Sequence, residues 1–148
     1  MTWGSLLLAV KIQRSDTCYE LPSRRDRRDA GWDCYAAENA TVPAGGMAKV
    51  SLGFSMELPA DWAALLLPRS GLAVRGITLS NAPGLIDSSY RGLVAALVSN
   101  YGSEPLEIAR GDRICQMAFL PVPDVSWQET QQLSVTERGA GGFGSTGL

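Results

Sequence analysis

The sequence predicts an all-β domain, and three observations support this prediction. The apolar runs are short, they are rich in β-branched residues or alternate with polar ones, and Gly, Pro and Asn interrupt them often. No window keeps a helical period for three turns. With 148 residues, 45% of them hydrophobic and 19% charged, the chain can bury one core without disulfides or metal. We therefore expect a single β-sandwich or jelly-roll domain.

The expected strands follow one another along the chain, with turn signals between them. The first is expected at residues 6–10, an apolar run that is too short to span a membrane. The others are expected at residues 47–58, 62–67, 77–80, 93–98, 105–109 and 113–121. Residues 70–74 are predicted to form one helical turn, with a serine able to cap the amides that follow.

The composition excludes several classes of function. The chain has no histidine, so any catalysis must use a carboxylate, tyrosine, lysine or a bound ion. A net charge of -2 favours neither nucleic acid nor a membrane as partner. Three cysteines without CxxC spacing indicate a reducing cytoplasm, where each would be a small buried apolar residue: Cys18, Cys34 and Cys115.

The arginine-rich run RRDRRD at residues 24–29 is the main charged feature of the chain. Its two aspartates halve the net charge of its four arginines. A solvated loop is therefore the expected structure, although arginine also suits phosphate and the edge of a nucleotide could pass nearby.

A single carboxylate stands out in the segment PGLIDSSYRG, residues 83–92. Asp87 lies between an apolar pair and Tyr90, in a segment bounded by glycines, which predicts a hairpin with Asp87 in or beside a pocket. Partial burial would fix the rotamer of this carboxylate, and a fixed carboxylate can take a proton from water. The structural alternative is a turn in which Asp87 only accepts hydrogen bonds from nearby amides.

Two other segments are further candidates for a site, and the first of them carries groups that suit phosphate. LPRSGLAVRG, residues 67–76, offers the Arg69 guanidinium, the Ser70 hydroxyl and the amides around Gly71. RGDRICQ, residues 110–116, is a Gly-Asp turn that leads into a strand, and an ordinary hairpin turn is its structural alternative.

The glycine-rich end of the chain allows two interpretations. Glycine loses much conformational freedom on ordering, so such a segment is often only a linker. Here, however, Arg138, Ser145 and Thr146 accompany small residues that leave amides accessible, although the spacing of a P-loop is absent. Phe143 adds a flat apolar face, which suits a lid over a heterocyclic base.

Five separated blocks together resemble the trimeric dUTPase family, in the order of that family's motifs. They are DAGWD at 29–33, PRSGLA at 68–73, GLIDSSYRG at 84–92, RGDRICQ at 110–116 and RGAGGFGSTG at 138–147. The resemblance implies a jelly-roll or distorted-barrel subunit with very little helix, over residues 1–136, and a flexible lid over residues 137–148. It also implies a homotrimer whose active sites are shared between subunits.

The reaction that this resemblance implies is the hydrolysis of dUTP to dUMP and pyrophosphate with Mg²⁺. Asp87 would be the general base for water attack on the α-phosphorus, and Asp33 would hold the metal through water. The residues expected to hold uracil and deoxyribose are Asn81, Gly84, Leu85, Ile86, Tyr90 and Phe143. Those expected to bind phosphate are Arg69, Ser70, Gly71, Gln116, Arg138, Gly142, Gly144, Ser145 and Thr146. The expected role is to keep uracil out of DNA and to supply dUMP for dTMP synthesis.

Two alternatives share the expected fold. One is a non-catalytic or regulatory nucleotide-binding trimer, against which the presence of Asp87 and Arg138 argues. The other is a dCTP deaminase, whose version of the second motif and whose glutamate for attack on the base are not found. The departures from the dUTPase pattern, at Trp32, Ser89 and Cys115, affect neither the base nor the phosphate arginines.

Overall fold

The structure is a computed structural model that describes residues 7–142. Over these residues the chain forms eleven strands and one short helix. In chain order they are β1 (Lys11–Arg14), β2 (Trp32–Tyr35), β3 (Ala40–Val42), β4 (Met47–Ser51), β5 (Phe54–Glu57), β6 (Trp62–Leu67), α1 (Ser70–Ala73), β7 (Ile77–Leu79), β8 (Gly84–Ile86), β9 (Ala95–Asn100), β10 (Leu106–Ile108) and β11 (Arg113–Pro121). Within this range no helix has the length and apolarity that crossing a membrane requires.

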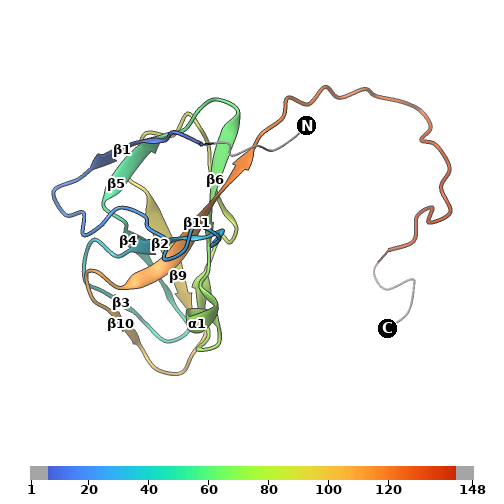
Figure 1. Ribbon diagram of the computed structural model, residues 1–148. Helices are drawn as coiled ribbons and strands as arrows, with labels where there is room; N and C mark the ends of the chain where they lie inside the picture. The colour runs from blue at the N-terminus through green and yellow to red at the C-terminus, as the bar shows by residue number, and fades with distance from the viewer. Residues whose placement is uncertain (1–6, 143–148) are drawn as a thin grey trace.

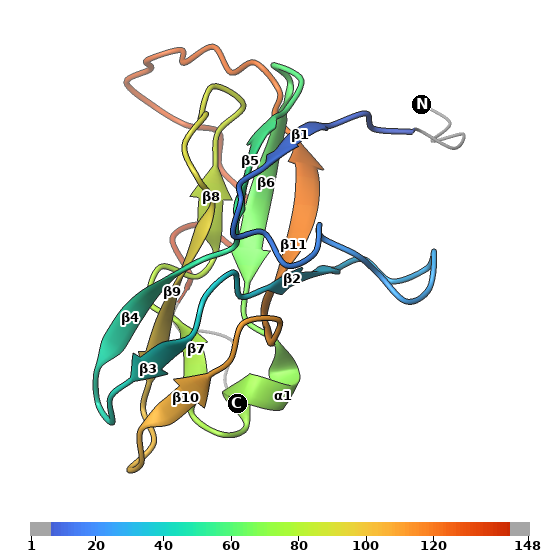
Figure 2. The same ribbon diagram turned by 90° about the vertical axis from the view of Figure 1, so that its left-hand side faces the viewer.

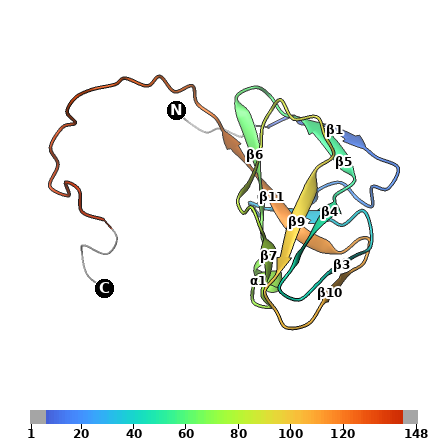
Figure 3. The same ribbon diagram turned by 180° about the vertical axis from the view of Figure 1, so that it is seen from behind.

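The strands pair antiparallel in four groups that surround one interior (Figures 1 and 2). The largest has the order β2-β11-β6-β8, the next β4-β9-β7, and the pairs β1-β5 and β10-β3 complete the domain. Figure 3 shows β4 and β9 side by side on the face seen from behind. After β11 the chain leaves the domain as an extended tail (Figure 1). The prediction of an all-β fold with very little helix is confirmed.

The core lies between these sheets, and strand alternation fills it. In β5, Phe54 and Met56 are buried while Ser55 and Glu57 are partly exposed, as expected for a strand with one face on the core. Phe54 is the largest fully buried side chain among the described residues. Burying a side chain of this size stabilises a fold by roughly 1.5–3 kcal/mol, so these positions hold the site's scaffold in place.

Several strand boundaries differ from the prediction by one or two residues, and two differences are larger. The prediction of a strand at residues 6–10 is wrong. The first strand, β1, begins at Lys11, which pairs with Glu57 on β5. The strand expected at residues 47–58 is two strands, since Gly53 takes a φ of 77° between them. That left-handed conformation, which glycine adopts readily, redirects the chain so that β4 pairs with β9 and β5 with β1. The strands expected at 62–67 and 113–121 are confirmed.

The short helix forms where predicted, but its cap is different. Arg69, not a serine, occupies the N-cap position in extended backbone, and no side chain caps the helix. Its guanidinium bonds instead to Asp33, on a neighbouring strand. The serine cap was therefore a wrong prediction, because Ser70 is the first residue of the helix and the N-cap position before it belongs to Arg69.

The three cysteines are free thiols. Cys34 and Cys115 are fully buried and face each other across β2 and β11, whereas Cys18 is only half-buried and departs from the expectation of burial. The hydrogen bond with Cys115 and burial raise the pKa of Cys34 well above its ordinary value. Cys34 therefore remains protonated, and the facing pair packs as small apolar side chains.

Candidate active site

One cavity brings together the residues of the predicted uracil and deoxyribose site. It has a volume of about 330 Å³. Its lining comprises Lys49, Leu66, Asn81, Gly84, Leu85, Ile86, Asp87, Tyr90, Leu93, Val94, Ala95 and Leu97. All the described residues that were predicted to hold uracil and deoxyribose therefore lie together with the predicted general base.

Strand β8 shapes one wall of this cavity through close backbone packing. It pairs with β6, where Gly84 is opposite Leu66. A Cβ atom at Gly84 would lie 3.2 Å from Asn81 Nδ2 and 3.4 Å from Leu66 Cβ, which is tight on both sides. Glycine at this position thus lets the Asn81 amide approach the backbone that lines the cavity.

Two hydrogen bonds fix Tyr90 in the turn that follows β8. Its amide donates to the Asp87 carbonyl at 3.1 Å, closing the turn after β8, and its hydroxyl donates to the Leu93 carbonyl at 3.1 Å. A side chain at Gly92 would overlap the Tyr90 ring. The aromatic ring therefore keeps its place because Gly92 leaves room for it.

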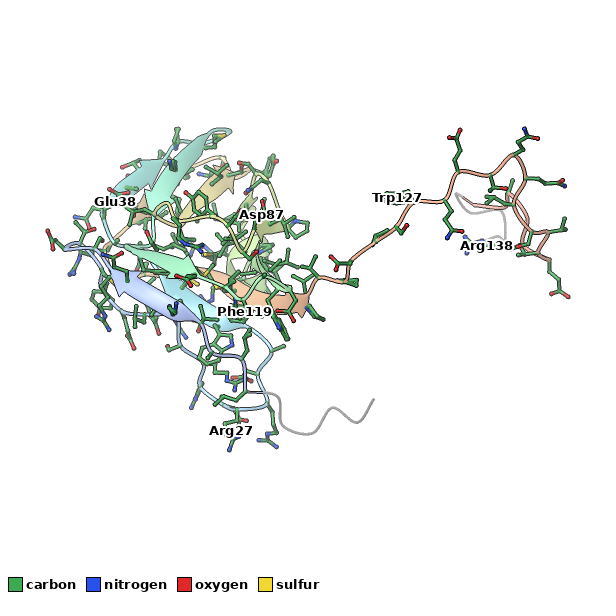
Figure 4. The ribbon with its side chains drawn as sticks, turned by 90° about the horizontal axis from the view of Figure 1, so that it is seen from above. Arg27, Glu38, Asp87, Phe119, Trp127 and Arg138 are labelled. Atoms are coloured by element: carbon green, nitrogen blue, oxygen red, sulfur yellow. The ribbon has the colours of Figure 1, made fainter. Side chains whose placement is uncertain are left out.

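Asp87 is exposed, so the partial burial expected for this carboxylate is not found in the single chain. The reason is its place in the sheet: β8 is an edge strand, and Asp87 follows its last residue, where no further strand covers it. Figure 4 shows Asp87 on the domain, far from Arg138 in the tail. Its carboxylate is therefore accessible to a ligand that enters the cavity.

A second cluster gathers around Asp33, at the junction of β2, β11 and the start of α1. Arg69 Nε donates to Asp33 Oδ1 at 2.9 Å, and Arg113 Nη1 donates to Asp33 Oδ2 at 3.1 Å. Arg69 also donates through Nη1 to the Arg113 carbonyl at 3.1 Å. One carboxylate therefore fixes the direction of two guanidinium groups, an arrangement that suits a phosphate group.

Gln116 joins this cluster through the register of β11. The register shifts between Arg113 and Cys115, a bulge that places Gln116 opposite Asp33. Gln116 Nε2 donates to the Pro68 carbonyl at 2.9 Å, which ties β11 to the segment before α1. Gln116, Asp33 and Arg69 thus lie close together although they come from three separate motifs.

The start of α1 is open to a ligand. A Cβ atom placed at Gly71 would meet nothing within 4 Å, and Ser70 beside it is exposed. The amides and the hydroxyl at this end are therefore free to meet phosphate oxygens, next to the guanidinium of Arg69.

The donors present fit magnesium held through water and not a protein-built metal cage. Within residues 7–142 no group of three or more His, Cys, Asp or Glu side chains could hold a metal ion. Both Asp33 oxygens already bond to arginines, and its side chain is 26% exposed. A carboxylate in this state can still accept a bond from a metal-bound water, which is how Mg²⁺ is often held when phosphates supply the other ligands.

The two clusters do not share a cavity within one chain. Asp87 lines the cavity described above, whereas Arg69 and Arg113 line a different one of about 380 Å³. Arg138 bonds within the tail, where its Nε donates to the Gly141 carbonyl at 2.9 Å (Figure 4). Gly142 is described and half-buried, and a Cβ atom placed there would meet nothing within 4 Å. The predicted contacts of Phe143, Gly144, Ser145 and Thr146 lie outside the described residues.

The arginine-rich run forms an exposed loop, as predicted. Asp26 accepts bonds from the backbone and the guanidinium of Arg28, and these bonds lower the pKa of the Asp26 carboxyl. Arg24 lies 4.6 Å over the Trp32 ring, so the loop packs beside β2, and Figure 4 shows Arg27 pointing away from the domain.

Sequence reasoning missed three basic residues that line these cavities, Arg75, Arg113 and Lys49. Arg113 stands three positions before Gln116 at the start of a predicted strand, a spacing that could have suggested it. Lys49 lies on the same strand face as Met47 and Ser51, and only its cross-strand pairing places it beside the predicted uracil site. Short-range sequence patterns carry no signal for such a pairing.

Fold and site together define an all-β domain with an exposed carboxylate in one cavity and, in a separate cavity, an arginine cluster whose geometry suits phosphate. A family model described as dUTPase matches residues 18–147. The deoxyuridine 5'-triphosphate nucleotidohydrolase of Anaplasma marginale (strain St. Maries) is 47% identical over 146 residues, which covers 95% of this chain and 99% of that protein. The enzyme of the same description from Yarrowia lipolytica is 46% identical over 143 residues, covering 95% and 90%. The chain belongs to the dUTPase family.

Solved structures share the fold. A Staphylococcus bacteriophage 80alpha dUTPase with dUPNHPP superposes with a TM-score of 0.86 at 22% identity, covering 95% of this chain and 99% of that one. A mutant dUTPase from phage phi11 of S. aureus, a structure concerned with the coordination of a structural Mg(II) ion, gives a TM-score of 0.76 at 18% identity, covering 84% and 97%.

Proposed function

We propose that this enzyme hydrolyses dUTP to dUMP and pyrophosphate by water attack on the α-phosphorus, with Asp87 as the general base. Hydrolysis of dUTP is the activity of the family to which the chain belongs. The observation that carries the proposed mechanism is the cavity in which Asp87 lies with Asn81, strand β8 and Tyr90. An exposed carboxylate in such a cavity can orient a water molecule and take its proton.

The base and the sugar are selected in the same cavity. Uracil presents an N3-H donor between two carbonyl acceptors, and the backbone of β8 with the Asn81 amide offers groups to match it. Cytosine reverses part of this pattern and would leave buried polar groups unpaired, which makes the discrimination large. Thymine is excluded by shape, and the Tyr90 ring leaves no room for a 2'-hydroxyl.

The cluster around Asp33 binds the phosphates of dUTP. Arg69, Ser70, Gly71 and Gln116 bind phosphate oxygens, while Asp33 keeps Arg69 in place and accepts a bond from a magnesium-bound water. Magnesium, when bound, neutralises charge on the triphosphate. Because Asp33 forms ion pairs with both Arg69 and Arg113, its main role is to orient these two guanidinium groups.

The enzyme acts as a homotrimer with active sites shared between subunits. What supports this is the separation of the carboxylate cavity from the arginine cluster, since a neighbouring chain can bring one beside the other. The C-terminal segment 137–148 is the lid: Arg138, Gly142, Gly144, Ser145 and Thr146 engage phosphates and Phe143 stacks on uracil. Sixteen residues from Leu133 onward can span roughly 50 Å, enough to reach a neighbour.

In the cell this reaction keeps uracil out of DNA and supplies dUMP for dTMP synthesis, and we assign it to the cytoplasm. Neither nucleic acid nor a membrane is a partner in this proposal.

The test is a pyrophosphate assay with Mg²⁺ and each deoxynucleoside triphosphate in turn. We expect release from dUTP alone, and Asp87→Asn should bind dUTP while its turnover falls by a factor of about a thousand or more. Asp16→Asn, which changes an exposed aspartate outside the cavity, is the matched control and should keep full activity. Wild-type turnover by Asp87→Asn would remove Asp87 from the mechanism, and ammonia release from dCTP would indicate a deaminase.

A further inference from the structure

Lys49 is a lining residue of the Asp87 cavity that has no assigned role. It lies on β4, in a different sheet from β8, and it is the one basic side chain among the described lining residues. The chain has only one other lysine, Lys11, whose ammonium pairs with Glu57 at 2.8 Å.

The Lys49 ammonium is not engaged by the protein. The four ion pairs formed within residues 7–142 use other basic side chains, and none of the hydrogen bonds in this range involves Lys49 Nζ. Lys49 is exposed, so the ammonium carries no burial penalty and needs no internal partner. It is therefore available to a ligand that enters the cavity.

Strand pairing places Lys49 at the Asn81 end of the cavity. Lys49 lies opposite Leu97 on β9, and the Leu97 carbonyl accepts a bond from the Ser80 amide at 2.8 Å. Ser80 directly precedes Asn81, so these residues form a row across the sheet that ends at the predicted base-binding side chain.

Tyr90 lies beside a different part of the cavity lining, at Leu93. Its hydroxyl donates a bond to the carbonyl of Leu93. Leu93 stands four residues before Leu97, the partner of Lys49, and four residues of extended chain span roughly 13 Å. In the proposed function, the sugar lies against Tyr90 and the reacting phosphate beside Asp87. The ammonium of Lys49 therefore lies toward the base and away from the phosphates.

We propose that Lys49 determines base specificity by donating a hydrogen bond to the O4 carbonyl of uracil. This inference rests on the proposed function, because it requires the base to occupy this cavity. An ammonium has only donors, so it pairs with the O4 acceptor of uracil and opposes the 4-amino group of cytosine. Thymine carries the same O4 as uracil, so Lys49 separates dUTP from dCTP and leaves the choice between dUTP and dTTP to cavity shape.

The first test measures kcat/KM for dUTP, dCTP and dTTP in wild type, Lys49→Met, Lys49→Arg and the matched control Lys11→Met. In Lys49→Met the preference for dUTP over dCTP should fall by about tenfold or more, as expected for loss of a bond to a charged donor. The preference over dTTP should stay the same, Lys49→Arg should restore part of the loss, and Lys11→Met should change neither ratio. An unchanged preference over dCTP in Lys49→Met would overturn the proposal.

The second test uses the wild-type chain and needs no variant to fold. An amine-acylating reagent labels the two lysines, and mass spectrometry reads the extent at each. Added dUMP should protect Lys49 several-fold and leave Lys11 unchanged; equal labelling with and without dUMP contradicts the inference. If wild type itself shows no dUTP-selective pyrophosphate release, the proposed function fails; if wild type is selective and only the Lys49 tests fail, this inference alone falls.

Discussion

Gly31→Ala should impair the site by displacing one side chain, Gln116. A Cβ atom at position 31 would overlap Gln116 Oε1 and lie 3.0 Å from Gln116 Cδ. The glutamine must therefore rotate, and the bond from its Nε2 to the Pro68 carbonyl, 2.9 Å long, is lost. Gly31 is not one of the glycines with a positive φ, so the backbone at this position accepts alanine without strain.

The size of the effect follows from the bonds involved. Loss of one neutral hydrogen bond by the half-buried Gln116 costs about 1 kcal/mol of folding stability. For a domain of this length, such a loss lowers Tm by about 2–4 °C. Loss of a bond from Gln116 to a charged phosphate costs about 1.5–3 kcal/mol, which corresponds to roughly a ten- to hundredfold fall in kcat/KM for dUTP.

A double-mutant cycle checks whether the effect passes through Gln116. We would measure pyrophosphate release and thermal unfolding of Gly31→Ala, Gln116→Ala and the double variant. If Gly31 acts only by making room for Gln116, then Gly31→Ala adds almost nothing in the Gln116→Ala background. Full additivity of the two losses, or wild-type kinetics for Gly31→Ala, would refute this reasoning.

Two further predictions concern the sugar and the tail. Gly92→Ala pushes its Cβ into the Tyr90 ring and should break the bond from the Tyr90 hydroxyl to Leu93. The ring then swings outward, and the preference for dUTP over UTP, measured as a ratio of kcat/KM values, should fall about tenfold; an unchanged ratio would remove Tyr90 from sugar selection. Deletion of residues 138–148 should leave Tm within about 2 °C of wild type and lower kcat by about tenfold or more. Full activity of the truncated chain would show that this segment does not act as a lid.

Local patterns in the sequence were sufficient to predict the strands that consist of continuous apolar runs. The runs at 62–67 and 113–121 became β6 and β11 because both lie inside the largest sheet, where long apolar strands are needed. The short strands β2, β3 and β8 were not predicted as strands. They have three or four residues each, and pairing with a neighbour, not their own composition, makes them strands.

The candidate site was predictable only in part. The motif blocks identified Asp87, Tyr90 and Arg69, because each carries a chemical group whose type and spacing are visible in the chain. The exposure of Asp87 was not predictable, since it depends on β8 lying at a sheet edge. The position of Lys49 beside the proposed base site also depends on the pairing between β4 and β9.

The sequence by itself determined the all-β class, the absence of histidine chemistry and the residue types of the dUTPase motifs, because these are properties of composition and short-range spacing. Only the tertiary structure decided that Asp33 would hold both Arg69 and Arg113, which are 36 and 80 positions away. It also decided that this cluster and the Asp87 cavity would lie apart in one chain. The physical reason is that sheet register is set jointly by turns, bulges and core packing across distant strands, and no single segment carries that information.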